Sequence, residues 1–115
     1  MTITIYHNPS CGTSRNVLQA LTDGGYAPQV IEYLKAGWDE VQLGDLFAKM
    51  GVKPRDMLRT KGALAEELRL TKPDVGDAEI LRAMTLHPVL VERPIVITPK
   101  GVFLCRPADR LQQAL

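Results

Sequence analysis

The sequence has little cysteine, almost no excess charge and no long apolar run, and each shortage excludes a class of protein. Two cysteines in 115 residues are too few for the disulfide framework of a small secreted domain. A net charge of +1 does not supply the electrostatic footprint of a nucleic-acid-binding protein. No stretch approaches the roughly 20 apolar residues of a membrane span, and the first residues form no signal sequence. We therefore expect a cytoplasmic protein that binds neither nucleic acid nor membrane.

Motifs for bound groups are also missing. The two histidines and two cysteines lie apart, without the spacing of metal ligands, and no dinucleotide-binding or P-loop signature occurs. The sequence therefore predicts no metal site and no bound cofactor. With 45% hydrophobic and 23% charged residues, the composition is typical of a soluble globular protein. A chain of this length is expected to form a single domain, residues 1–115.

The first third of the chain alternates strand and helix. Thr2–His7 is a β-branched and aromatic run that predicts a strand, and turn residues follow it. From Thr13 the apolar spacing is helical until Gly24 and Gly25, where a left-handed residue can end the helix. Gln29–Leu34 is the second predicted strand. Strand, helix and strand within about 34 residues indicate a right-handed parallel crossover.

The middle of the chain, about 38–88, predicts a helical insertion. Asp39 is a candidate N-cap with Gln42 three residues later, and apolar residues then repeat at helical spacing. Pro54 can begin a short turn, and a later helix is expected to begin at Asp77 and end before Pro88.

The last part of the chain predicts a hairpin and a terminal helix. The hairpin strands are 95–98 and 102–105, joined by a turn in which Gly101 supplies the positive φ. Pro107 suits the first position of a terminal helix. The elements together predict a thioredoxin-like α/β fold: a four-stranded mixed sheet with the helical insertion between its βαβ and ββα halves.

Cys11 lies where the first strand passes into the first helix. Unpaired N–H groups and the positive end of the helix dipole stabilise an anion at such a position, so we expect a thiolate. Thr13, Ser14 and Arg15 add donors that could hold an oxyanion. The alternative is that Thr13 and Ser14 only cap the helix while Cys11 packs as a small apolar residue. In Cys-Gly-Thr-Ser, Ser14 occupies the position of a second thiol, so a resolving thiol must come from elsewhere.

Three segments resemble one known family. They are His7 to Asn16 (HNPSCGTSRN), Glu92 to Pro99 (ERPIVITP) and Leu104 to Pro107 (LCRP). These segments are similar to those of the glutaredoxin-coupled arsenate reductases, and the resemblance extends over nearly the whole chain. It implies a thioredoxin-like core with a helical insertion, which agrees with the layout predicted from the residues.

The resemblance also implies a reaction. Cys11 would attack arsenate and form a thioarsenate, glutathione would add as co-substrate, and glutaredoxin would complete the reduction to arsenite. The family's three oxyanion-binding arginines fall on Arg59, Arg93 and Arg106, and its histidine before the loop falls on His7. Guanidinium groups offset the repulsion between a thiolate and a charged oxyanion, which supports such a grouping.

Several residues keep two interpretations. His7 could tune the thiolate or move a proton, although a lone histidine at a strand end more often has a packing or hydrogen-bonding role. Cys105 is expected to pack in the core, and the less favoured alternative is that it acts as the resolving thiol for Cys11. The remaining arginines at 55, 69, 82 and 110 are expected to be solvated or to form surface ion pairs. The fold resemblance predicts a cis bond between Arg93 and Pro94.

Two other functions stay open. A related glutathione-dependent thiol oxidoreductase could use the same loop for a different substrate. A redox-sensing regulator that binds RNA polymerase is a weaker alternative, because such proteins typically carry a C-x-x-C switch and Ser14 replaces its second cysteine.

Overall fold

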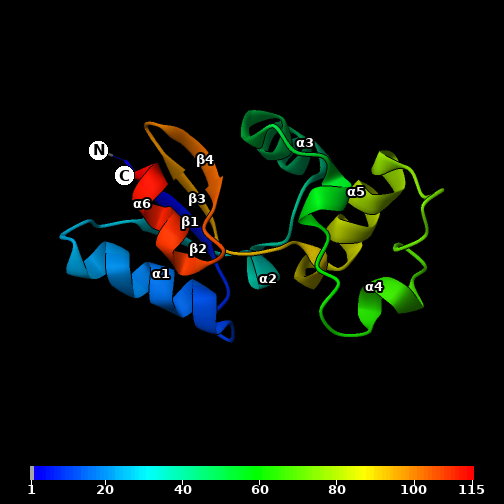
Figure 1. Cartoon of the computed structure of the whole chain (residues 1–115), viewed down its shortest axis with the longest axis horizontal. Coiled ribbons are helices and arrows are strands. Elements are labelled where there is room, and N and C mark those ends of the chain that lie inside the picture. The colour runs from blue at the N-terminus through cyan, green and yellow to red at the C-terminus, as the bar shows by residue number, and fades with distance from the viewer. Residues whose placement is uncertain (1) are drawn as a thin grey trace. The chain divides into compact units, whose positions relative to one another are not determined.

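The computed structural model describes residues 2–115, which Figure 1 shows coloured along the chain. The chain divides into two compact units. The sheet unit combines Met1–Ala36 with Arg93–Leu115, and the helical unit is Gly37–Glu92. The insertion predicted at about 38–88 is therefore a compact unit of its own. That the whole chain acts as a single domain stays a prediction.

The sheet unit is built on four short strands, β1 (Thr4–His7), β2 (Gln29–Glu32), β3 (Ile95–Thr98) and β4 (Gly101–Leu104). Their order in the sheet is β2-β1-β3-β4. Strands β1 and β2 are parallel, with Thr4 paired to Gln29, whereas β3 is antiparallel to both β1 and β4. The predicted mixed sheet, with its parallel crossover and its hairpin, is confirmed.

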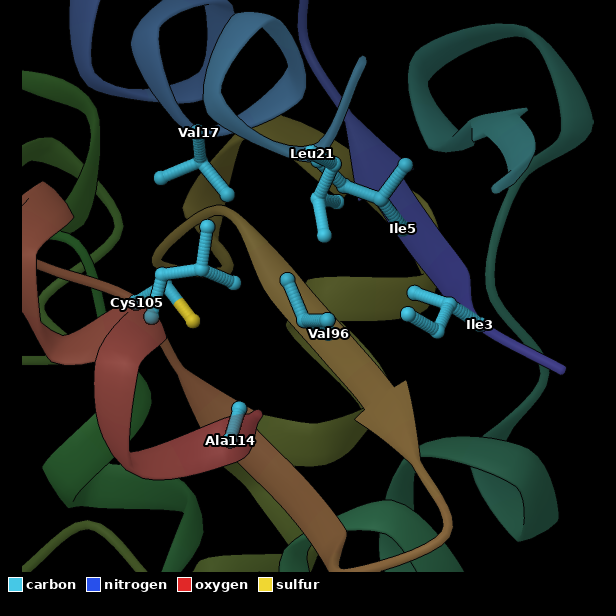
Figure 2. Close-up of a cluster of buried hydrophobic side chains, with 8 residues drawn as sticks. Ile3, Ile5, Val17, Leu21, Val96, Cys105 and Ala114 are labelled. Atoms are coloured by element: carbon cyan, nitrogen blue, oxygen red, sulfur yellow. The ribbon is translucent and has the colours of Figure 1, made fainter. Parts of the chain in front are cut away.

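Helix α1 (Gly12–Asp23) connects the two parallel strands and covers the core of the sheet unit. Its Val17 and Leu21 are fully buried against Ile5 and Val96 of the neighbouring strands, as Figure 2 shows. The spacing of four residues places Val17 and Leu21 on one face of the helix, which explains why that face is buried. The buried members of this core are Ile3, Ile5, Val17, Leu21, Val96, Cys105, Leu111 and Ala114.

Two elements differ from the prediction. Strand β2 ends at Glu32, and Tyr33–Ala36 form the short helix α2, whose Tyr33 is buried. The C-terminal helix begins as a 3-10 turn, η3 (Ala108–Arg110), before the single α-helical turn α6 (Leu111–Ala114). A hydrogen bond from Thr98 Oγ1 to the Ala114 carbonyl (2.7 Å) secures this end against β3.

The helical unit follows the predicted caps. Asp39 accepts hydrogen bonds from the N–H groups of Val41 and Gln42, and the Gln42 side chain accepts from the Asp39 N–H, which is the predicted capping box. The elements of this unit are α3 (Glu40–Met50), η1 (Pro54–Met57), α4 (Leu64–Glu67), α5 (Asp77–Leu86) and η2 (Pro88–Leu90). Within residues 2–115, no helix is long and apolar enough to span a membrane.

Candidate active site

The loop between β1 and α1 holds Cys11 at the N-cap of the helix. Its backbone is extended (φ −97°, ψ 121°), and its N–H donates to the Asn8 carbonyl at 3.0 Å. The Asn8 side chain in turn accepts from the Ser10 N–H at 2.9 Å. The side chain of the N-cap residue, Cys11, makes no capping hydrogen bond, and the Ser14 hydroxyl bonds to His7 and to the Asn8 N–H, which precede the helix. The turn places Cys11 at the N-terminus of α1, where the Ser14 N–H lowers the pKa of its thiol.

The hairpin β3–β4 brings two arginines together at one end. Arg93 lies just before β3 and Arg106 just after β4, and the Cys105 N–H donates to the Pro94 carbonyl at 3.0 Å. The predicted cis bond between Arg93 and Pro94 is confirmed, and Arg106–Pro107 is cis as well. An antiparallel register fixes which residues lie opposite one another, so the two arginines are placed as a pair.

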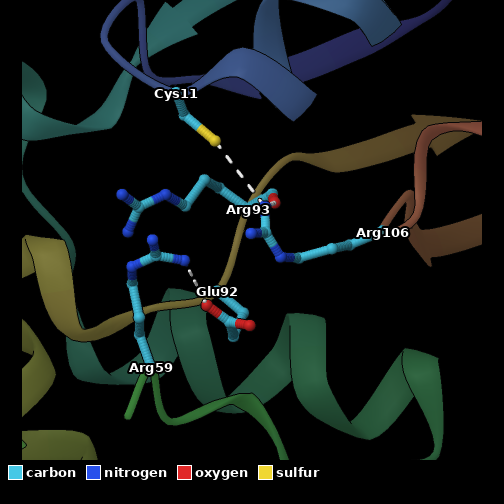
Figure 3. A network of polar contacts seen from close by, with 5 residues as sticks. All are labelled: Cys11, Arg59, Glu92, Arg93 and Arg106. Atoms are coloured by element: carbon cyan, nitrogen blue, oxygen red, sulfur yellow. Dashed lines mark hydrogen bonds and ion pairs between the residues drawn. The ribbon is translucent and has the colours of Figure 1, made fainter. Parts of the chain in front are cut away.

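Both arginines interact with the sulfur of Cys11. Arg106 Nη1 donates to Cys11 Sγ at 3.6 Å and also approaches the Arg93 carbonyl at 3.4 Å, as Figure 3 shows for Cys11 and Arg106. Arg93 is 7% exposed, and its guanidinium lowers the pKa of the same thiol. The structure therefore brings together Cys11 and two of the three arginines predicted for the site.

The surroundings of Cys11 favour the ionised thiol. Burial by itself raises the pKa of Cys11, because a thiolate loses hydration inside the protein. The Ser14 N–H and the guanidinium groups of Arg93 and Arg106 act in the opposite direction and outweigh burial, so the pKa lies below its ordinary value. The thiolate predicted from the loop position is thus supported: the Ser14 N–H at the helix start is the largest single effect that lowers the Cys11 pKa, and the two arginines add to it.

His7 and Ser14 form a buried polar pair beside the loop. His7 Nδ1 lies 2.6 Å from Ser14 Oγ, and the Asn8 N–H donates to the same oxygen at 3.0 Å. Burial lowers the pKa of His7; the Glu32 carboxylate acts against this effect, and the charge of Arg15 adds to it. The hydroxyl of Ser14 therefore faces the interior, where it links the first helical turn to the end of β1.

Arg15 supports the loop from outside. Its Nη1 donates to the Pro9 carbonyl at 2.9 Å, and the residue is exposed. In this arrangement the guanidinium braces the turn that carries Cys11. Whether Thr13 or Arg15 also contacts a bound oxyanion stays a prediction.

Arg59, the third predicted arginine, belongs to the helical unit. Its Nη1 forms an ion pair with Glu92 Oε1 at 2.9 Å, and both side chains are largely buried (14% and 22% exposed). The Arg59 N–H donates to the Leu90 carbonyl and the Glu92 N–H to the Met57 carbonyl. Figure 3 draws this pair. Sequence reasoning predicted Arg59 but missed its partner, although Glu92 stands directly before Arg93 in the chain.

Cys105 has a different environment. It is fully buried within the apolar core of the sheet unit, and burial raises its pKa to about 11. Figure 2 shows its sulfur among aliphatic side chains. The thiol is therefore protonated at neutral pH and shielded from solvent, which favours the packing interpretation over a resolving role.

Asn8 is a site residue that the sequence reasoning missed as such. The sequence indicates only a turn at this position, yet Asn8 is 3% exposed and makes three of the hydrogen bonds that shape the Cys11 loop. A preference of asparagine for turns was the available signal, and it does not distinguish a surface turn from a buried one.

The site combines a thiol nucleophile with groups that stabilise an anion. A thiolate attacks an electrophilic centre, while guanidinium donors neutralise the charge of an incoming oxyanion and orient it. Among residues 2–115, no group of three or more His, Cys, Asp or Glu side chains is arranged to hold a metal ion.

Residues 6–114 match a family model described as the ArsC family. The chain belongs to the ArsC family. Among its relatives, a Synechocystis protein named arsenate reductase ArsI2 is 59% identical over 107 residues, 93% of this chain and 76% of the relative. An arsenate reductase of Escherichia coli K12 is 42% identical over 113 residues, 98% of this chain and 80% of the relative.

A solved structure extends the likeness to the fold. The arsenate reductase from Vibrio cholerae has a TM-score of 0.94 and 38% identity, covering 100% of this chain and 98% of that protein. The ArsC proteins have a thioredoxin-like fold, so the fold class predicted from the sequence is confirmed.

Proposed function

We propose that this chain reduces arsenate to arsenite, with the Cys11 thiolate as the nucleophile. The observation that carries the proposal is the thiol held at the helix N-terminus, with Arg106 Nη1 3.6 Å from its sulfur and the Arg93 guanidinium lowering its pKa. Membership of the ArsC family supports it, as do the relatives named arsenate reductase.

The first step is a condensation. The thiolate of Cys11 attacks the arsenic of arsenate, an As–S bond forms, an As–O bond breaks and the oxygen leaves as water after protonation. Arsenic stays pentavalent in this thioarsenate. Arg93 and Arg106 have two tasks here: they keep the thiol ionised before the attack and then neutralise the oxyanion charge. We assign the same second task to Arg59, as the family resemblance implies.

The reduction itself requires two thiols from outside the chain. Overall, arsenate and two glutathione molecules give arsenite, glutathione disulfide and water, so arsenic gains the two electrons that the sulfurs lose. Ser14 cannot act as a resolving thiol, and Cys105 is buried with a raised pKa. Glutathione as co-substrate and glutaredoxin as protein partner therefore remain our proposal, in the reducing environment of the cytoplasm.

A coupled assay tests the function. Arsenate-dependent oxidation of NADPH is measured with glutathione, glutaredoxin and glutathione reductase for the wild type, Cys11→Ser and Cys105→Ala. We expect turnover in the wild type and in Cys105→Ala, and none above background in Cys11→Ser.

The same assay separates the competing functions. Folded wild type that reduces mixed disulfides but not arsenate would establish the related thiol oxidoreductase instead. Copurification of RNA polymerase together with no turnover would establish the regulator. Omitting glutaredoxin, or replacing glutathione with thioredoxin and its reductase, tests the reducing partner separately from the substrate.

A further inference from the structure

The hydroxyl of Ser14 is enclosed and has two neighbours. Ser14 is fully buried, and its Oγ accepts from the Asn8 N–H at 3.0 Å. The second neighbour is His7 Nδ1 at 2.6 Å. A backbone N–H can only donate, so that bond uses a lone pair of the hydroxyl and leaves its proton to be placed. Among residues 2–115, the imidazole nitrogen is the one acceptor found for that proton.

Two arrangements of protons are possible at this pair. In the first, Ser14 donates to Nδ1, and the imidazole is neutral with its proton on Nε2. In the second, Nδ1 carries a proton and donates to Ser14, which leaves the hydroxyl proton buried without an acceptor. An unsatisfied buried donor costs about 1–3 kcal/mol, so the first arrangement is the stable one.

We propose that Ser14 is a positioning residue whose hydroxyl holds His7 as the neutral imidazole with its proton on Nε2. The imidazolium is disfavoured for the same reason, because it also carries a proton on Nδ1. Protonating His7 therefore requires breaking the bond that Ser14 donates. The proton arrangement stands on the hydrogen-bond geometry alone, whereas its importance for turnover rests on the proposed function.

The charged groups around His7 agree with a neutral ring. Glu32 pairs with His7 across the parallel strands β1 and β2, and its carboxylate favours the imidazolium. Burial is the larger effect and lowers the pKa of His7, and Arg15 from α1 lowers it further. The net direction is towards the neutral form, which the Ser14 bond reinforces.

The charged and hydrogen-bonding groups around Cys11 then have separate roles. If His7 is neutral, the positive charge that stabilises the thiolate comes from Arg93 and Arg106. Ser14 contributes in two ways, because its N–H stabilises the thiolate while its hydroxyl fixes the ring beside the loop. This position is the one that carries a second cysteine in dithiol motifs, so here a hydrogen-bonding anchor replaces a redox partner.

Nitrogen-15 NMR of the histidine side chains tests the proposal in the unmodified protein. The sequence has two histidines, and the spectrum of His87→Gln identifies the signals of His7. Between pH 7 and 8 we expect the pattern of the neutral ring protonated on Nε2. A doubly protonated ring at pH 7, or a neutral ring protonated on Nδ1, would overturn the proposal, whatever the activity of the protein.

Variants then test the role of the hydroxyl. Ser14→Ala should give a mixture of neutral tautomers and a measurable rise in the pKa of His7, whereas Ser14→Thr, which keeps the hydroxyl, should restore the wild-type pattern. Thr22→Ala, which removes an exposed hydroxyl from the same helix, is the matched control. A single Nε2–H tautomer and an unchanged His7 pKa in folded Ser14→Ala would show that Ser14 does not fix the ring.

Discussion

The two cysteines are buried to almost the same extent, but their surroundings shift their pKa values in opposite directions. Cys11 is 8% exposed and Cys105 is fully buried, yet the pKa of Cys11 is lowered and that of Cys105 is raised to about 11. Burial raises the pKa in both regions. The difference arises because Cys11 has the Ser14 N–H and two guanidinium groups, whereas Cys105 has aliphatic neighbours. Donors, rather than exposure, decide which thiol can react.

The core around Cys105 and the surroundings of Cys11 are adjacent in the sequence, because Arg106, which contacts Cys11, directly follows Cys105. Successive side chains of an extended segment point to opposite faces, so one residue enters the core while the next reaches the sulfur of Cys11. The contrast between the two thiols can be tested at the level of reactivity, stability and ionisation.

Alkylation should show the largest difference. With a pKa of about 11, only about one Cys105 in ten thousand is a thiolate at pH 7, and the residue is also inaccessible. We expect iodoacetamide to modify Cys11 more than about a thousandfold faster than Cys105. Mass spectrometry of peptides from the folded protein measures the ratio, and urea-unfolded protein is the control in which the two rates converge. Comparable rates in the native state would remove the contrast.

The pH dependence of stability should carry the signature of Cys105. Below pH 9 its thiol is protonated in the folded and unfolded states, so its contribution is constant. Between pH 9 and about 11 the unfolded chain loses this proton first, and the free energy of unfolding falls by about 3 kcal/mol. Urea unfolding of the wild type and Cys105→Ala across this range isolates the effect, since other groups titrate in both.

Cys11 should give the opposite slope. Its folded pKa is lowered, so its contribution is fully present above the ordinary thiol pKa and is lost as the pH falls through the folded pKa. The same unfolding series with Cys11→Ser measures it. Identical slopes for the Cys11→Ser and Cys105→Ala differences would contradict the assigned environments.

A hydroxyl at position 105 should destabilise the core without affecting the site. Cys105→Ser places a polar group among aliphatic side chains, which costs about 1–3 kcal/mol when the hydroxyl finds no acceptor. Cys105→Ala is the control for lost volume. Urea unfolding measures the difference, and thiolate absorbance should give an unchanged pKa for Cys11. A changed Cys11 pKa would mean that the two regions are coupled.

Loss of one guanidinium should produce the smallest effect. Arg106→Gln removes a charged donor to Cys11 Sγ, and we expect the pKa of Cys11 to rise by about one unit, with alkylation at pH 7 slowed by up to about tenfold. Arg110→Gln is the matched control, because Arg110 acts on Cys105 instead. Titration of thiolate absorbance compares the two variants. Equal shifts would show a general effect of net charge.

Local patterns were sufficient to predict most of the fold. The capping box at Asp39 and Gln42, the apolar stripe of α1 and the hairpin around Gly101 all depend on residues close in sequence. The end of β2 was missed because Tyr33 and Leu34 suit a strand by propensity, and tertiary packing decides that they begin a helix. At the C-terminus of α1, Gly25 has the predicted left-handed conformation (φ 84°), whereas Gly24 does not.

The site was predicted in its residues but not in its contacts. The motif spacing indicated Cys11, Arg93 and Arg106, whereas the Ser14–His7 bond depends on the approach of a helix and a strand end that no local pattern encodes. Arg55 shows the same limit. We expected a solvated charge, yet its guanidinium donates to the carbonyls of Leu70, Lys72 and Val75 and so organises a loop of the helical unit.

The β3–β4 hairpin has a consequence for how the sequence can vary. Four residues of each strand, Ile95–Thr98 and Gly101–Leu104, separate the tip of the turn from the end that carries Arg93 and Arg106. The length and register of the two strands therefore fix where the two arginines lie relative to the turn. Residues added at the tip, around Pro99 and Lys100, leave both arginines at equal reach, while a single insertion within one strand would exchange the inward and outward positions beyond it. Insertions and deletions should therefore be tolerated in the turn between β3 and β4 but not within either strand.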